Sequence, residues 1–254
     1  MNNQLSFPEK LLRCLYDMAF YSGVLKEKTS RAVKFGILVA LFFGSLAMVR
    51  PLVEWSRTID LIVQDMEVHL AEFTIENGVL VSESQTPYAL NMDGLAIVVD
   101  PTGEETALQA GAGFGFYLTQ TRMIVRNGLN REQGLTYDGL LKESFGKEDL
   151  QTLIGTMKLG GLALIPLGAL YGIPMLFLSA AVTMFFGRLL FAIARKPISY
   201  RDSFVIAIHT QVLGGTLLLI SSVMLLDMPL FYPVSLMLMG LTYSRLAQWQ
   251  DQDH

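Results

Sequence analysis

The residues of this chain whose types could support chemistry are few, and the most informative of them lie inside long apolar segments. His209 and Gln211 fall two positions apart in one such segment, and Lys158 falls in another. A polar side chain in an apolar segment costs free energy unless it finds a partner, so these residues could line a path for a proton or a small solute. The alternatives are a hydrogen bond between helices for His209 and Gln211, and an ammonium of Lys158 that reaches the lipid headgroups.

Other catalytic and ligand-binding patterns are weak. A single cysteine, Cys14, and three scattered histidines predict neither a disulfide framework nor a zinc site. The Gly111–Gly115 segment lacks a third glycine at the spacing of a nucleotide-binding loop and a helix after it, and Glu104 and Glu105 lack the spacing of a calcium loop. There is no Gly-x-Ser-x-Gly sequence to mark a serine nucleophile, and His69 falls in a helical stalk. We therefore expect no enzymatic activity, no cofactor and no metal.

The composition is typical of a membrane protein. Of the 254 residues, 52% are hydrophobic and 17% are charged, and the mean hydropathy is +0.42. The expected fold class is an all-α polytopic membrane bundle of four or five transmembrane helices with an inserted β-rich extracytoplasmic domain. The expected spans cover about 33–49, 153–194, 204–226 and 231–246.

The number of crossings depends on residues 153–194, which are about twice the length that a bilayer core requires. A break at Tyr171–Pro174 would give a hairpin of two spans and five crossings in all. One crossing plus a bent or interfacial half-helix would give four. The two alternatives put the basic loop at 195–202 and the C-terminus on opposite sides of the membrane.

The charge distribution predicts the orientation. Residues 56–150 hold 6 Lys and Arg against 15 Asp and Glu, whereas the remaining chain holds 13 against 8. Since positive charge favours the cytoplasmic side, we expect a cytoplasmic N-terminus and an external acidic domain in a multi-pass protein. The polar lead before the first span and the lack of a cleavage site after it predict an uncleaved anchor.

Local patterns divide the chain further. Ser6 and Pro8 predict an amphipathic N-terminal helix, which either lies on the inner membrane surface or packs against the bundle. Asn77–Gly78 between β-forming residues predicts a hairpin, strands are expected at 95–99 and 114–125, and helical character returns at 137–150. The expected divisions are 1–32 as the N-terminal segment, 33–55 as the first transmembrane helix, 56–150 as the β-rich domain with helical stalks, 151–248 as the membrane bundle and 249–254 as a polar tail.

Small and basic residues complete the candidates. Two stripes of mostly small residues recur at helical spacing, and they predict close helix packing rather than a pore. The first contains Gly161, Ile165, Gly168 and Gly172, and the second contains Ala207, Gln211, Gly214 and Ser221. A basic loop contains Arg195, Lys196, Tyr200 and Arg201.

Three segments carry a resemblance to a known family. They are Phe73-Thr74-Ile75-Glu76-Asn77-Gly78-Val79-Leu80, then Val98-Val99-Asp100-Pro101-Thr102-Gly103, then Arg195-Lys196-Pro197-Ile198-Ser199-Tyr200-Arg201. In this order they resemble a membrane family of unknown function from Gram-positive bacteria, some of whose members are labelled maltodextrin-utilization proteins, and which is distantly similar to the Yip-type proteins. The resemblance implies a bacterial cell membrane location and a link to sugar uptake, and it implies no catalytic residues.

Together these observations favour a non-enzymatic integral membrane protein that acts as an accessory, sensing or scaffolding partner of an envelope complex. Its expected partners are the lipid bilayer and a membrane or envelope protein, with no nucleic acid. Surface contacts are expected on the external domain, at Glu104, Glu105, Arg122 and Arg126. The alternative is a permease-like transport component, in which His209, Gln211 and Lys158 contact a small solute.

Overall fold

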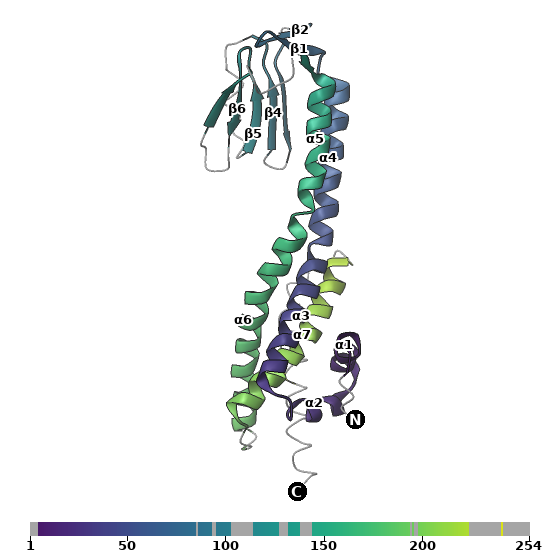
Figure 1. The fold of residues 1–254 in the computed structure, drawn as a ribbon, viewed down its shortest axis with the longest axis vertical. Helices are drawn as coiled ribbons and strands as arrows, with labels where there is room; N and C mark the ends of the chain where they lie inside the picture. The colour runs from purple at the N-terminus through teal and green to yellow at the C-terminus, as the bar shows by residue number, and fades with distance from the viewer. Residues whose placement is uncertain are drawn as a thin grey trace. The chain divides into compact units, whose positions relative to one another are not determined.

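The computed structural model describes residues 5–84, 86–92, 95–102, 114–126, 132–137, 144–193, 195, 198–223 and 240 (Figure 1). The chain divides into two compact units. Met1–Leu52 and Leu162–His254 make up the first, here called the helical unit, and Val53–Gly161 makes up the second, here called the β-rich unit. The architecture therefore combines a helical part with a β region.

Three long helices form the core of the helical unit and lie side by side (Figure 1). They are α3 (Thr29–Ala47), α6 (Leu164–Ile193) and α7 (Tyr200–Val223), and two short helices precede them, α1 (Phe7–Tyr16) and α2 (Met18–Val24). Apolar side chains from all three long helices, among them Val39, Ala180 and Ile208, are almost fully buried between them.

The N-terminal helix α1 packs against the bundle. Its start is fixed by a capping box, in which the backbone N–H and the hydroxyl of Ser6 each donate to Glu9 at 3.0 Å. Its apolar face is covered, since Cys14 is buried in the same cluster as Phe35 and the rings of Phe7 and Phe35 lie 5.9 Å apart. The N-cap prediction is confirmed, and of the two predicted placements the structure shows packing on the bundle.

Glycines set the contact between α3 and α6. A Cβ added at Gly172 would lie 2.8 Å from the carbonyl oxygen of Ala40, and one at Gly168 would lie 2.7 Å from that of Gly44. These distances are far inside van der Waals contact, so only glycine lets the two backbones approach this closely.

Helix α6 is continuous from Leu164 to Ile193 and passes through Pro174. Of the two alternatives for residues 153–194, the hairpin that breaks at Tyr171–Pro174 is therefore wrong. Gly172 serves the contact with α3 rather than a turn, and a proline within an apolar helix removes one backbone donor without ending the helix. The break falls earlier, at Leu162 and Ala163, between α6 and the preceding helix α5 (Lys147–Gly161).

The β-rich unit contains α5, most of α4 (Val49–His69) and two sheets. The first sheet has the order β2-β1-β8 and is antiparallel, and the second has the order β3-β4-β5-β6-β7, with one parallel pair, β4 and β5. The strands are β1 (Phe73–Glu76), β2 (Val79–Ser82), β3 (Tyr88–Met92), β4 (Leu95–Val99), β5 (Phe114–Leu118), β6 (Arg122–Arg126), β7 (Glu132–Thr136) and β8 (Ser144–Gly146).

Turn chemistry explains the first hairpin. Asn77 and Gly78 have φ values of 52° and 77°, as a two-residue type I′ turn requires. This prediction is confirmed, as are the strands at 95–99 and within 114–125. The expected helical character of 137–150 is wrong at 144–146, which form β8, because Phe145 pairs with Ile75 and is buried there.

One hydrophobic core joins the helices and sheets of the β-rich unit. Ile59, Ile62 and Met66 of α4 are fully buried with Leu150 and Ile154 of α5. The same cluster takes in one face of the second sheet, through residues such as Ile97 and Leu118. This core fixes the end of α4 against β3 and β4.

Three helical segments among the described residues are long and apolar enough to cross a membrane, by length and composition. They cover Thr29–His69, Lys147–Ile193 and Tyr200–Ser221. Of the further span predicted at 231–246, all residues but Gly240 lie outside the described part of the chain.

Candidate binding pocket of the β-rich unit

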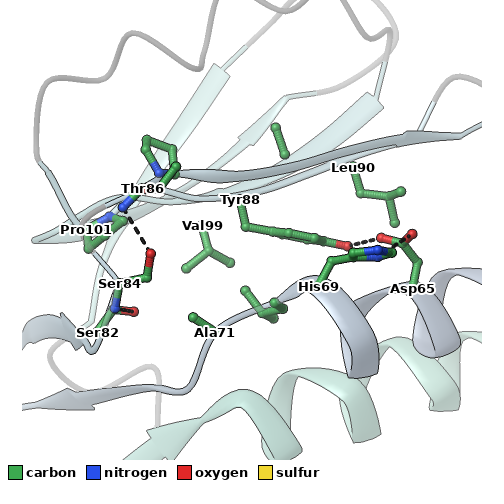
Figure 2. Close-up of a pocket in the computed structure, with 13 residues that line it drawn as sticks. Asp65, His69, Ala71, Ser82, Ser84, Thr86, Tyr88, Leu90, Val99 and Pro101 are labelled. Atoms are coloured by element: carbon green, nitrogen blue, oxygen red, sulfur yellow. Dashed lines mark hydrogen bonds and ion pairs between the residues drawn. The ribbon is translucent and has the colours of Figure 1, made fainter.

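A pocket of about 380 Å³ opens within the β-rich unit, between the end of α4 and the edge of the second sheet (Figure 2). This volume is at the lower end of the range for small-molecule sites. Its lining comes from α4, the end of β2 and the segment after it, strands β3 and β4, and their flanking residues: Asp65, His69, Leu70, Ala71, Ser82, Ser84, Thr86, Pro87, Tyr88, Ala89, Leu90, Val99 and Pro101.

Local structure explains why these side chains converge. Asp65 and His69 are four residues apart, and so lie on one face of the last turn of α4. Tyr88 and Val99 are directly paired across β3 and β4, and Leu90 is two residues further along β3. Paired residues and residues two apart share a face of the sheet, so all three face the pocket.

The carboxylate of Asp65 organises one end of the pocket. Its Oδ2 accepts a hydrogen bond of 2.7 Å from the hydroxyl of Tyr88, and its Oδ1 lies 3.0 Å from Nδ1 of His69 (Figure 2). Because a carboxylate only accepts, Nδ1 carries the proton and Nε2 of His69 is left for other partners. Burial, together with the neighbouring carboxylate, raises the pKa of Tyr88, so its hydroxyl remains a donor.

Three hydroxyl residues form the other end. Ser82 Oγ donates to the carbonyl oxygen of Glu72 at 3.0 Å, and Ser84 Oγ accepts from the N–H of Thr86 at 3.1 Å. Figure 2 shows Ser82 and Ser84 at the opposite end from His69. The pocket therefore has the composition of a binding site with two polar ends, rather than that of a serine nucleophile beside its base.

Two of the predicted intramembrane candidates, His209 and Gln211, lie in the helical unit and contact other residues of that unit. His209 is fully buried, stacks on Phe35 with ring centroids 4.8 Å apart, and has Nδ1 2.8 Å from the carbonyl oxygen of Val205. Gln211 donates to Thr183 Oγ1 at 3.2 Å and to the carbonyl oxygen of Ala207 at 3.0 Å. Gln211 thus has a hydrogen bond to another helix, as the alternative to a transport path requires, whereas His209 bonds within α7 and meets α3 by ring stacking.

Lys158 is not part of that group. It belongs to α5 in the β-rich unit, where its ammonium forms an ion pair with Asp60 of α4. Nearby, the indole of Trp55 donates to the carbonyl oxygen of Met157 at 3.0 Å. Lys158 thus contributes to the contact between α4 and α5.

Sequence reasoning missed an ionic cluster at the start of the helical unit. The ammonium of Lys10 lies 2.7 Å from both carboxylate oxygens of Glu27, and His209 Nε2 lies 3.3 Å from Glu27 Oε2 without hydrogen-bond geometry. Partial burial alone would raise the pKa of Glu27, but the imidazole and the ammonium outweigh it and lower the pKa to about 2. The cluster holds α1, the segment after α2, and α7 together.

The basic loop is tied to the same region. The guanidinium of Arg201 donates to the carbonyl oxygen of Glu27 and forms an ion pair with Asp202. Arg188 lies 3.5 Å over the ring of Tyr200. Arg195 has a φ of 57°, which is the left-handed conformation that often follows a helix, and Lys196 lies outside the described residues.

The remaining predicted candidates differ in their placement. Gly168 and Gly172 lie at the α3 contact described above, whereas Gly214 is half-buried in α7. The close approach on α7 is found at its neighbour Gly215, where an added Cβ would lie 2.7 Å from the ring of Phe43.

The surface candidates of the β-rich unit are only partly described. Arg126 pairs with Glu132 at 2.5 Å and lies over the ring of Tyr117. Arg122 is exposed on β6, and Glu104 and Glu105 lie outside the described residues.

The pocket itself was missed, although one part of it could have been found. The spacing of Asp65 and His69 on a predicted helix indicates two titratable side chains on one face. Tyr88 gave no such signal, because β3 follows Pro87 and contains Asn91, which are both unfavourable for a strand.

Comparison with known proteins gives one match. A family model described as "Protein of unknown function (DUF1189)" matches residues 9–247. No curated protein and no solved structure matches the chain.

Proposed function

The chain belongs to this family of proteins of unknown function, and we propose that it is a non-enzymatic integral membrane protein whose β-rich unit recognises a small ligand outside the cytoplasm. It would act as the accessory or sensing partner of an envelope complex in a bacterial cell membrane. The resemblance noted in the sequence would connect that complex with carbohydrate uptake.

The observation that carries this proposal is the pocket of the β-rich unit. It combines a volume suited to a small molecule with an apolar floor and a few polar groups at its ends, which is the usual composition of a ligand site. The polar residues of the bundle, by contrast, have partners within the bundle. His209 stacks on Phe35, and Gln211 is hydrogen-bonded to Thr183.

The membrane part of the proposal is supported by the three apolar segments and by the position of the basic residues. Arg201 contacts Glu27, so the basic loop lies at the end of the bundle that carries Lys26 and Lys28. With α6 continuous, this arrangement favours a single crossing by residues 164–193, with both basic segments on the cytoplasmic side.

A matched pair of tryptophan variants tests the proposal. Ser84→Trp would fill the pocket from a partly exposed position, whereas Val81→Trp adds the same side chain to an exposed position on β2 outside the pocket. Each is expressed in a strain that lacks the gene, with membrane levels checked, and scored on the growth defect of that strain. The proposal requires Ser84→Trp to lose function and Val81→Trp to retain it.

A further variant, compared with Ser84→Trp, tests the rival transport function. Gln211→Leu removes the bundle hydrogen bond to Thr183 while keeping a side chain of similar volume. Loss of function in this variant, with full function in Ser84→Trp, would replace the sensing proposal with transport. If Ser84→Trp instead loses function, affinity capture from solubilised membranes, compared between wild type and this variant, would identify the envelope partner.

A further inference from the structure

The described lining of the pocket contains an acidic residue but no lysine or arginine. Asp65, His69 and Tyr88 are the ionisable residues among its described lining, and no Lys or Arg is found among them. Asp65 is the carboxylate among them, and it accepts hydrogen bonds from Tyr88 and from His69. A ligand that enters this end therefore meets a negative charge.

The free atoms at this end are hydrogen-bond acceptors. Each carboxylate oxygen of Asp65 has a lone pair beyond the one it already uses, and in the neutral imidazole of His69 a proton on Nδ1 leaves Nε2 with a lone pair. The complementary group is rich in donors and carries positive charge, as an ammonium does with its three N–H bonds. An anionic group would find neither a donor nor a countercharge here.

The rest of the pocket suits an apolar body with an uncharged polar tail. Val99 and Leu90 lie along the floor, and the hydroxyls of Ser82 and Ser84 lie at the far end (Figure 2). The Ser82 proton is donated to Glu72, but the Ser84 hydroxyl can still donate and both oxygens can accept, so they suit a neutral polar group. The surrounding segment 56–150 has nine more acidic than basic residues, which favours the approach of cations.

We propose that the pocket of the β-rich unit binds a small organic amine, with its ammonium at Asp65 and His69 and its apolar body over Val99. This inference rests on the proposed function and names the ligand class of the same site.

Three probes of similar length test whether the pocket prefers a positively charged ligand. 6-Amino-1-hexanol carries an ammonium, an apolar chain and a hydroxyl, 1,6-hexanediol is its neutral counterpart, and 6-hydroxyhexanoate is its anionic counterpart. Binding to the full-length protein in lipid nanodiscs is measured by calorimetry near pH 7.5, with empty nanodiscs as the blank. We expect the amine to bind at least tenfold more tightly than the other two, since hydrogen bonds to charged groups contribute more than neutral ones. Equal binding of the diol or the carboxylate, or no binding of the amine, overturns the proposal.

Variants locate the binding. Asp65→Asn keeps the shape and removes the charge, and should weaken amine binding about tenfold or more. Asp60→Asn is the control, because Asp60 lies on the same helix but pairs with Lys158 outside the pocket. Ser84→Trp provides a second route to the same loss without altering Asp65. Amine binding that survives both Asp65→Asn and Ser84→Trp overturns the assignment to this pocket.

Two further comparisons separate the alternatives. Nα-acetyl-lysine methylamide imitates a lysine side chain of a protein partner, and tighter binding of this probe than of 6-amino-1-hexanol overturns a free amine as the ligand. If Ser84→Trp loses function in cells while the amine does not bind wild type, the ligand class is wrong and the sensing role stands. If the amine binds through Asp65 while Ser84→Trp functions fully, the ligand class stands and the sensing role is wrong.

Discussion

Glu27 is the residue on which the N-terminal part of the helical unit depends most directly. Its carboxylate contacts the ammonium of Lys10 and the imidazole of His209, and its backbone carbonyl accepts from Arg201. A single residue thus links α1, the basic loop and α7. Removing its charge would leave a largely buried ammonium at Lys10 without a counterion.

We predict that Glu27→Gln lowers the stability of the helical unit by roughly 1–3 kcal/mol at neutral pH. The pKa of Glu27 is lowered from 4.5 to about 2, so its ionised form is favoured by folding. The contribution is fully present above pH 4.5 and is lost as the pH falls through 2. Thermal unfolding of both proteins in detergent between pH 7 and pH 2 measures it. The difference in melting temperature between wild type and Glu27→Gln should become smaller below pH 4.5. A difference that stays constant down to pH 2 would contradict the prediction.

Single residues were predictable from the sequence where a local rule acts. Ser6 and Glu9 form the capping box because the motif needs only neighbouring backbone groups, and the Asn77–Gly78 turn likewise depends on two φ values. The meeting of Asp65 with Tyr88 depends instead on how a helix end packs on a sheet. That packing joins residues 23 positions apart in the chain, and no local pattern encodes it.

At the scale of elements, α3 and α6 approach each other closely. This contact depends on Gly168 and Gly172 of α6 and on Gly44 of α3. A Cβ added at Gly44 would lie 2.5 Å from the carbonyl oxygen of Gly168. The stripe on α6 was visible in the sequence, because its glycines recur at helical spacing. Gly44 was not singled out, since it stands alone within an apolar run.

We predict that Gly168→Leu destabilises the helical unit by about 1–3 kcal/mol, because the added side chain would have to displace Met48 and the backbone of α3. Gly160→Leu is the matched control, since an added Cβ there meets nothing within 4 Å. The melting temperature in detergent, followed by the helical signal in circular dichroism, compares the two. Equal melting of both variants would show that the α3–α6 contact does not require glycine.

Helix α6 shows where sequence rules for elements mislead. Tyr171–Pro174 has the composition of a turn, yet the helix continues because its surroundings are apolar and Gly172 packs on Ala40. Strand β8 was missed for the opposite reason. Its three residues are too few for a pattern, and they form a strand because β1 offers an edge for Phe145.

At the scale of the whole molecule, the proposed orientation in a membrane is the main quantity to measure. Cys14 is 2% exposed, and burial raises the pKa of its thiol to about 12. It would therefore react poorly with maleimides whichever side it faces. The natural chain thus serves as an unreactive background for cysteines placed elsewhere.

We predict that an impermeant maleimide labels Glu83→Cys in intact cells, and labels Tyr16→Cys and Tyr200→Cys only after the membrane is opened. All three positions are exposed in the structure. The expected pattern follows from the acidic charge of 56–150 and from the shared position of the two basic segments. Labelling of Tyr200→Cys in intact cells would contradict a single crossing by α6, and labelling of Tyr16→Cys alone would reverse the orientation.

The core of the β-rich unit also has a consequence for the time course of biosynthesis. Ile62 of α4 is buried with Ile154 of α5, which the ribosome adds roughly ninety residues later. At about 5–20 residues per second, this delay is on the order of 5–20 s. Throughout that interval the apolar side of α4 has been made but its covering helix has not. The nascent chain must therefore be shielded from aggregation at this stage, so factors that bind translating chains should affect its yield more than its final stability.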